Sequence, residues 1–214
     1  MANHMLNERL ISGDACVAEG SAWLCAHDPR FADALSLTGP LPSRLREGGF
    51  HQLLSAIVSQ QLSVSAAAAI WARVEQAGVT TPEAIQNSND EDMRALGLSR
   101  QKIGYARALA DAGIDFDCLP QKSLDDVIAE LTAVSGIGVW TAEIYAMFSL
   151  HRADVFAHAD LALQEAARHL FALDKRPTPK VMRDMADKWR PWRSVAARLL
   201  WAYYKHINER EGVR

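Results

Sequence analysis

Gly136 and Gly138 stand in the stretch SGIGVWTAEIYAMF, immediately before apolar residues with helical spacing. Glycine costs a helix roughly 1 kcal/mol relative to alanine, so this pattern indicates that a bare backbone is needed here. The free N–H groups at the start of the second helix would point outward, with the positive end of the helix dipole behind them. That arrangement is typical of a phosphate site, whereas a single glycine would favour a plain helix-helix turn with a glycine cap.

Positive charge gathers at the C-terminal end of a chain whose formal net charge is -3. Residues 175–214 carry 11 Lys and Arg against 4 Asp and Glu, a net +7, whereas the remaining residues carry 12 against 22, a net -10. Such a run is usually a solvated helix face. Close to a phosphate site, it becomes a candidate for a surface that faces nucleic acid.

The elements that must position these groups are helices, because the apolar spacing is helical nearly throughout and no segment alternates as a strand does. Capping residues support several starts, for example Thr81 and Thr178 before proline and Ser123 before two aspartates. We therefore expect an all-α fold. The expected helices cover about 14–27, 49–59, 63–77, 89–96, 99–113, 123–132, 139–150, 160–170, 178–189 and 191–209.

The composition, 49% hydrophobic and 23% charged, is ordinary for a globular protein. No targeting segment and no run of ~18 apolar residues is evident, so we expect a cytoplasmic protein, nucleoid-associated if bacterial, with no membrane partner. Cys16, Cys25 and Cys118 are too scattered for a disulfide framework or an iron–sulfur cluster, and we expect buried thiols. Trp189 and Trp192 are assigned to the core.

Four segments in order carry a family resemblance. LTAVSGIGVWTAEIYAMF resembles the hairpin of the helix-hairpin-helix DNA glycosylase superfamily, specifically its alkylation-repair branch, the 3-methyladenine DNA glycosylase II type. AIVSQQLSVSAAAAIWARV, LGLSRQKIGYARALADA and DKWRPWRSVAARLLWAYY resemble further helices of that family. The resemblance covers about residues 48–207 and corresponds to a compact form without the N-terminal β-rich domain of larger members.

The resemblance implies one glycosylase unit over 1–214, a monomer whose partner is double-stranded DNA containing a damaged base. It implies two helical subdomains with a cleft between them. The first, about 47–150, is a helical barrel that includes the hairpin at about 123–150, and the second combines 1–46 with 151–214.

In this family the hairpin backbone holds DNA phosphate, which here implies roles for Gly136, Gly138 and Thr141. No cofactor is required. A structural monovalent cation often lies on hairpin carbonyls, which by position belong to Thr132, Val134 and Ile137.

The family pattern Asp-Val-Phe, at 154–156, is followed by an aspartate before a helix, which is Asp160. The resemblance implies that Asp160 is catalytic. A carboxylate near ribose carbon 1 stabilises the charge that develops as the bond to the base stretches, and it can orient or deprotonate water. The alternative is a helix cap worth about 1 kcal/mol. Where relatives carry proline or a second acid, this chain has His158 and Ala159, and His158 either tunes Asp160, touches phosphate or is merely exposed.

Residues 136–150 contain no lysine, and Trp140 takes the place of the lysine nucleophile of the strand-cutting branch. The resemblance therefore implies a monofunctional enzyme that uses water rather than a Schiff base. Alkylation leaves a purine cationic, and a desolvated cation over an indole gains about 2 kcal/mol. By family position, Trp140 and Trp201 line the base pocket, with Ile144 and Tyr145 at a third aromatic position.

A flipped base leaves a gap in the DNA stack, and the family fills it from the turn that is SQQLS here. Gln61 matches the intercalating position and Gln60 is its neighbour, although two glutamines between helices also suit a plain polar turn. Arg190 and Arg193 are candidates for phosphate contacts, which would make binding fall with salt.

Other functions remain open on the sequence. A non-catalytic helix-hairpin-helix DNA-binding protein would need no carboxylate at Asp160, and a helical protein adaptor would leave both glycines unexplained. A glycosylase for an oxidised base or uracil is disfavoured by Trp140. Preference among 3-methyladenine, 7-methylguanine, hypoxanthine and ethenoadenine depends on pocket shape.

Overall fold

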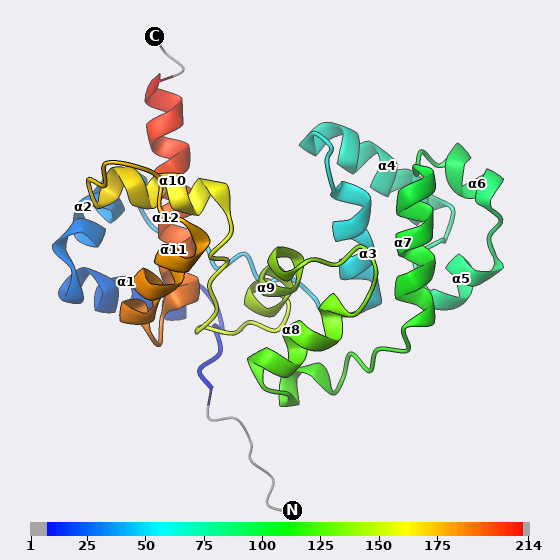
Figure 1. Cartoon of the computed structure of the whole chain (residues 1–214), viewed down its shortest axis with the longest axis horizontal. Coiled ribbons are helices and arrows are strands. Elements are labelled where there is room, and N and C mark those ends of the chain that lie inside the picture. Colours follow the sequence, from blue (N-terminus) through cyan, green and yellow to red (C-terminus); the bar gives the residue numbers. More distant parts are fainter. Residues whose placement is uncertain (1–7, 212–214) are drawn as a thin grey trace, which may run out of the picture. The chain divides into compact units, whose positions relative to one another are not determined.

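The computed structural model describes residues 8–211, and the chain divides into two compact units. Unit 1 is Arg46–Tyr145, and unit 2 combines the described residues of Asn7–Leu45 with those of Ala146–Arg214. Within residues 8–211 the regular structure is helical apart from one isolated bridge between Leu10 and Arg152 (Figure 1). The predicted all-α class is confirmed.

Unit 1 is built from short helices that pack around α7. Its elements in chain order are α3 (Phe50–Ser59), α4 (Val64–Gln76), α5 (Pro82–Asn87), α6 (Asp90–Ala95), α7 (Arg100–Asp111), η1 (Leu119–Gln121), α8 (Leu124–Thr132) and α9 (Val139–Phe148). Helices α3, α5 and α6 each pack against α7. The last residues of α9, from Ala146 onward, belong to unit 2.

Unit 2 packs its helices around the long C-terminal helix. Its elements are α1 (Asp14–His27), α2 (Pro29–Thr38), α10 (Leu161–Leu170), α11 (Pro179–Ala186), η2 (Asp187–Trp189) and α12 (Arg193–Glu211). Helices α1, α2 and α10 all contact α12.

Capping side chains set many of these helix starts. Thr81, Ser123 and Thr178 each accept a hydrogen bond from the backbone N–H three residues on, which confirms the predicted starts. Helix α1 has the predicted bounds. The helix predicted over 178–189 ends at Ala186 and is followed by a 3₁₀ turn at 187–189. The last helix begins at Arg193 rather than at 191, after Arg190 in an extended conformation.

Two helices lie outside the ranges predicted from the sequence. Helix α2 has a clear start, since Asp28 caps it and Pro29 takes its first position, but its inward face offers only Phe31 and Ala34. Helix α5 has the predicted capping threonine and only six residues. Helix α5 is shorter than two full turns, and α2 turns only two residues toward the core, so apolar periodicity alone reveals neither helix.

The core of unit 2 is an aromatic cluster centred on Trp189. Its ring lies 5.5 Å from Phe31, 5.3 Å from Phe156 and 5.9 Å from Phe171, measured between ring centroids. Trp192 is 2% exposed. Both tryptophans are therefore core residues, as predicted.

The cysteines correct a prediction about burial. Cys118 is exposed, and Cys16 and Cys25 are half-buried, so none of them is the buried thiol expected from the sequence. Each has a small side chain near the surface of its helix or loop, where composition alone says little about exposure.

Candidate functional site

The turn between α8 and α9 turns its backbone outward. Val134 and Ile137 are 6% and 4% exposed, so the apolar side chains of the turn point into unit 1. Ile137 donates its N–H to the carbonyl of Val134 at 3.1 Å, which closes the turn. Ser135 and Gly138 are exposed. Two exposed residues of the turn, Ser135 and Gly138, therefore carry a small side chain or none.

The two hairpin glycines serve different purposes. Gly136 has φ +94°, and a Cβ built on it would lie 2.3 Å from Cγ of Tyr105, so the fold itself demands glycine there. Gly138 has no positive φ, and a Cβ on it would meet nothing within 4 Å. Nothing in the described structure requires Gly138 to be bare, which points to an external group that approaches its backbone.

Gly138 marks the N-terminus of α9. Its carbonyl accepts the N–H of Ala142 at 3.1 Å, the first hydrogen bond of the helix. A residue in this position usually carries a side chain that covers the free N–H groups of the first turn, and glycine carries none. The N-terminus of α9 therefore suits an anion.

A second exposed turn of unit 1, residues 60–63 between α3 and α4, contains the two predicted glutamines. We call it the wedge turn. Gln60 ends α3 and donates its side-chain N–H to the carbonyl of Gly136 at 2.8 Å, whereas Gln61 is exposed with φ +56°. Ser63 caps α4 by accepting the N–H of Ala66. The structure thus gives the two glutamines different tasks.

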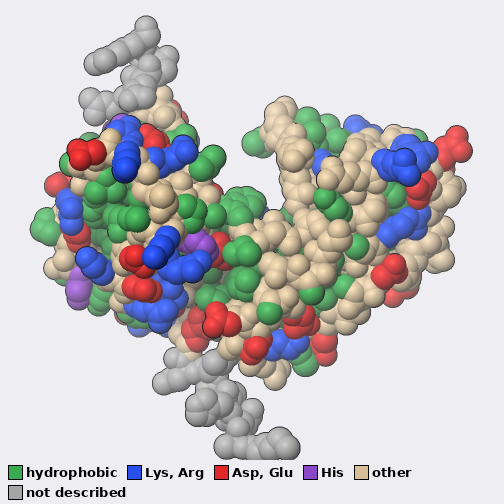
Figure 2. All heavy atoms as spheres, viewed as in Figure 1, with side chains coloured by type: hydrophobic (Ala, Val, Ile, Leu, Met, Phe, Trp, Pro, Cys, Tyr) green, Lys and Arg blue, Asp and Glu red, His purple; other side chains and the backbone are tan. Residues whose placement is uncertain are grey.

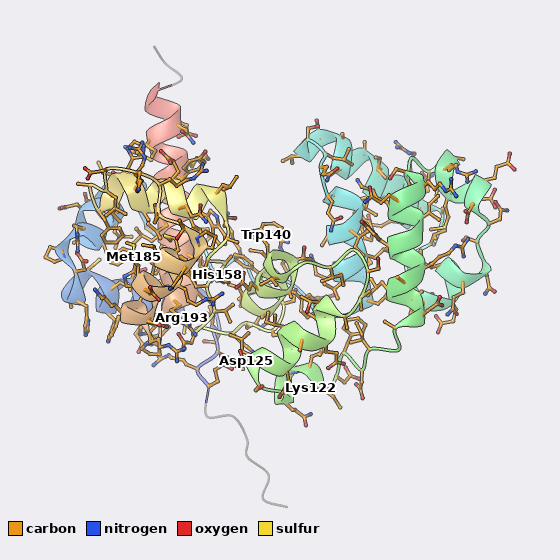
Figure 3. All side chains as sticks on the ribbon, viewed as in Figure 1. Lys122, Asp125, Trp140, His158, Met185 and Arg193 are labelled. Atoms are coloured by element: carbon orange, nitrogen blue, oxygen red, sulfur yellow. The ribbon has the colours of Figure 1, made fainter. Side chains whose placement is uncertain are left out.

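Exposed apolar side chains in unit 1 gather at these two turns. Among the described residues of unit 1, the exposed large hydrophobic side chains are Leu62, Val64, Val139 and Trp140. Two lie in or directly after the wedge turn, and two lie in the first turn of α9. Figure 3 labels Trp140, which is 47% exposed, on α9. Exposed apolar side chains that gather at a few turns, rather than lying scattered, are typical of a binding surface.

Two other predicted residues of α9 are buried. Tyr145 is 3% exposed, its ring lies near Phe116, and its hydroxyl accepts the N–H of Gly49 at 2.7 Å. Burial raises the pKa of this phenol. Thr141 is 8% exposed, and Ile144 is half-buried. This burial argues against Tyr145 as a wall of an open pocket and against a DNA contact by the Thr141 side chain.

In unit 2, Asp160 lies at the N-terminus of α10. Its Oδ1 accepts the N–H of Leu163 at 3.0 Å, and its backbone carbonyl accepts the N–H of Gln164. The cap that the sequence offered as an alternative is therefore present. A carboxylate has about four acceptor sites, so capping by Oδ1 is compatible with a chemical role and fixes the direction of the group.

The segment before Asp160 is anchored to two helices. Ser194 of α12 is fully buried, donates its hydroxyl to the carbonyl of Arg152 at 2.6 Å and its N–H to the carbonyl of Ala153. Gln164 of α10 is 3% exposed and donates its amide to the carbonyl of His158 at 3.1 Å. These contacts hold the backbone that leads into Asp160.

His158 pairs with a residue that the sequence did not single out. Its Nε2 lies 2.7 Å from Nη2 of Arg183 on α11. Burial, together with the positive charge of Arg183, holds the pKa of His158 below its usual range. A neutral ring that accepts from Arg183 satisfies both groups. His158 and Arg183 are 25 residues apart with α10 between them, and no local sequence pattern predicts their contact.

The predicted basic residues of the C-terminal segment meet carboxylates. Arg193 has a side chain only 12% exposed, and its Nε lies 2.5 Å from Asp154. Nη1 of Arg190 lies 3.5 Å from Oδ2 of Asp154, and its Nε lies 3.4 Å from Oδ1 of Asp187. Figure 2 shows basic and acidic side chains side by side on the face of unit 2 that carries α11. Arg193 is thus an internal anchor of the Asp154 loop, and phosphate binding stays a prediction for the more exposed Arg190.

Trp201 is supported from within unit 2. Its ring stacks on Phe148 with centroids 6.0 Å apart, and the guanidinium of Arg198 lies 4.5 Å above the same phenylalanine. Arg198 also donates to the carbonyls of Ser43 and Ser194. Burial lowers the pKa of Arg198 to about 10. Trp201 itself is half-buried, so one part of the indole remains accessible.

A groove of about 890 Å³ also lies in unit 2, between α1, α2 and residues 39–42. It contains none of the predicted site residues, and its one carboxylate, Asp14, already accepts the N–H of Ser43. Within residues 8–211 no group of three or more His, Cys, Asp or Glu side chains is placed to hold a metal ion.

Residues 54–191 match the family described as the HhH-GPD superfamily of base excision DNA repair proteins. The chain belongs to this superfamily. The predicted family is thereby confirmed. The chain is 34% identical over 185 residues to DNA-3-methyladenine glycosylase 1 of Schizosaccharomyces pombe, covering 82% of this chain and 81% of that protein.

Solved structures of the superfamily agree with this assignment. The S. pombe 3-methyladenine DNA glycosylase in complex with abasic DNA matches with a TM-score of 0.74 and 32% identity, covering 86% of this chain and 95% of that one. DNA-3-methyladenine glycosidase from Bacillus halodurans matches with a TM-score of 0.78 and 35% identity, covering 94% of each chain. None of the helices within residues 8–211 is long and apolar enough to cross a membrane.

Proposed function

We propose that this protein is a monofunctional DNA N-glycosylase that removes alkylated purines of the 3-methyladenine and 7-methylguanine type from double-stranded DNA, as a step of base excision repair. Its superfamily and its likeness to enzymes named DNA-3-methyladenine glycosylases support this. The observation that carries the proposal is Asp160, whose carboxylate is held in one direction by the Leu163 N–H at the end of an anchored loop.

Asp160 would act on the sugar rather than on the base. As the bond between ribose carbon 1 and the purine nitrogen stretches, positive charge develops on the sugar, and a fixed carboxylate stabilises it. Water then adds to carbon 1, and its proton passes to the carboxylate and on to solvent. A cationic alkylated purine leaves as a neutral base, so no strong general acid is needed.

Unit 1 would grip the DNA. The N-terminus of α9 at Gly138 would offer backbone N–H groups and a positive dipole to a phosphate. The wedge turn offers Gln61 and the 39% exposed Leu62 to the space that a flipped base leaves behind. Breaking the stack costs a few kcal/mol, and a side chain that fills the gap offsets part of it.

Two tryptophans would each offer an aromatic face to the base. Trp140 in unit 1 is 47% exposed, and Trp201 in unit 2 is braced by Phe148. An indole face attracts a cationic purine more than a neutral one, because the ring quadrupole is negative above the plane. The electrostatic preference for alkylated bases would therefore arise without any charged residue in contact with the base.

The hairpin carbonyls suit a structural monovalent cation. Each backbone carbonyl has two lone pairs, and that of Val134 uses one of them for the N–H of Ile137. With the carbonyls of Thr132 and Ile137 it would supply oxygen ligands of the kind such ions prefer. The ion would stiffen the turn and take no part in the chemistry.

The test uses duplexes that each carry one of 3-methyladenine, 7-methylguanine, hypoxanthine or ethenoadenine. We expect the base to be released while the strand stays intact until hot alkali cleaves the abasic site. Strand cleavage without alkali would indicate a lyase. Binding of the duplexes without release of any base would indicate a DNA-binding protein and would overturn the proposal.

A further inference from the structure

The wedge turn and the hairpin, 76 residues apart in sequence, are joined by one side-chain hydrogen bond. Nε2 of Gln60 donates to the carbonyl oxygen of Gly136 at 2.8 Å, and the Gln60 side chain is half-buried. The bond therefore ties the residue before the intercalating position to the residue in the middle of the phosphate-binding turn.

Helix α7 contacts both the end of α3, just before the wedge turn, and the hairpin. Nζ of Lys102 donates to the carbonyl of Val58 at 2.6 Å, in the last turn of α3 just before the wedge turn. Burial lowers the pKa of Lys102. One turn further along α7, Tyr105 packs so closely on Gly136 that no Cβ fits between them. Neighbouring positions of α7 therefore support the base of each turn.

The residue after Gln60 has an unusual backbone conformation. Gln61 has φ +56°, a left-handed conformation that costs a non-glycine residue roughly 1 kcal/mol. Such a conformation persists only where the surroundings fix it. The Gln60 side chain is directed to the hairpin, whereas the next residue, Gln61, is exposed to solvent.

We propose that Gln60 is a positioning residue: its bond to the Gly136 carbonyl holds Gln61 at a fixed distance from the phosphate-binding turn, so that gripping the backbone and filling the stack occur together. This inference rests on the proposed glycosylase function. A Gln61 side chain that is already held in place needs little further ordering when DNA binds. A loose side chain must be ordered as the base leaves, which costs free energy.

The test compares Gln60→Met, which keeps the shape and removes the donor, with Gln86→Met. Gln86 is a matched control, because its amide also donates one hydrogen bond within unit 1, to Asp111 at 2.9 Å. Single-turnover excision is measured on a lesion opposite its normal partner and on the same lesion opposite an abasic nucleotide, where opening is easier. The readout is the ratio of the two rates within each variant.

We expect Gln60→Met to lower excision from the paired duplex by about tenfold, as for one lost hydrogen bond, and to affect the unpaired lesion much less. Gln86→Met leaves the ratio as in the wild type. Loss of folded protein lowers both rates together and leaves the ratio unchanged, so an unchanged ratio in Gln60→Met overturns the proposal.

A double-mutant cycle with Gln61→Ala separates positioning from direct contact. If Gln60 acts through Gln61, Gln60→Met has no further effect on the ratio once Gln61 is alanine. Additive effects would mean that Gln60 acts independently of Gln61 and would overturn the proposal. Wild-type protein that releases no base from any duplex would instead contradict the glycosylase function.

Discussion

Gly138 in unit 1 and Asp160 in unit 2 occupy equivalent places in two ten-residue helices, α9 and α10. In each case the residue's carbonyl accepts the first hydrogen bond of the helix. Asp160 covers the N-terminus of α10 with its own carboxylate. Gly138 has no side chain with which to cover the N-terminus of α9.

The difference separates two tasks that a DNA-processing enzyme must perform. A helix N-terminus stabilises negative charge whether the charge comes from the protein or from a ligand. In α10 the charge belongs to the protein and is fixed, as the proposed action of Asp160 on a sugar requires. In α9 the charge would come from DNA, so the protein supplies only backbone. Exchanging the two arrangements tests the comparison.

The largest effect is expected from Asp160→Asn. Asparagine caps a helix about as well as aspartate, so the fold should survive, but the negative charge is lost. We expect single-turnover excision to fall by about a thousandfold or more while binding to abasic-site DNA persists. The control is Asp28→Asn, which makes the same substitution at the cap of α2, also removes the ion pair between Asp28 and Arg30, and should leave excision unchanged. Near-normal excision by Asp160→Asn would contradict the mechanism.

A smaller but large effect is expected from Gly138→Asp, which gives α9 the cap that α10 has. The free energy of unfolding should stay the same or rise, because aspartate is a good cap. DNA affinity should fall by about a hundredfold, since a carboxylate would then stand at the proposed phosphate site. Gly138→Ser, a neutral cap, should weaken binding less.

The neighbouring glycine should give the opposite result. Gly136→Ala places a methyl group against Tyr105 at positive φ, so we expect a loss of about 2 kcal/mol or more in the free energy of unfolding. Denaturant unfolding of the two variants provides the comparison. If Gly138→Asp unfolds as easily as Gly136→Ala, the distinction between an internal and an external reason for glycine is wrong.

The smallest effect concerns the loop that leads to Asp160. The pKa of His158 is lower in the folded chain than in the unfolded chain. Below about pH 6.5, His158 therefore binds a proton more readily in the unfolded chain than in the folded one. Stability should therefore fall as the pH drops from 6.5 toward the folded pKa. In His158→Gln, which can still accept from Arg183, the fall in Tm between pH 7.5 and 5.5 should be smaller. His51→Gln, on unit 1, serves as the control; equal falls in wild type and His158→Gln would contradict this account.

Much of the helical framework was predictable, because capping residues and apolar spacing are local signals. Helix α1 has its predicted bounds, and Ser123 and Thr178 cap as their sequence context indicates. Asp28 and Pro29 are typical residues of a helix start, but apolar spacing does not predict α2 because so few of its residues face the core.

The candidate site was less predictable, because its important contacts join distant positions. The bond from Gln60 to Gly136 spans 76 residues, and Arg193 meets Asp154 across 39. The local run of basic residues predicts a phosphate surface, but one of its members, Arg193, pairs with Asp154 of an internal loop. The sequence could show that two glycines were unusual, but only the position of Tyr105 distinguishes the one needed by the fold.

The contact between Tyr105 and Gly136 has a consequence for the lineage of this protein. The ring occupies the space that any side chain at position 136 would need, and the positive φ there would strain a side chain even if the ring were smaller. Position 136 is therefore expected to stay glycine in descendants of this protein, whatever residue stands at 105.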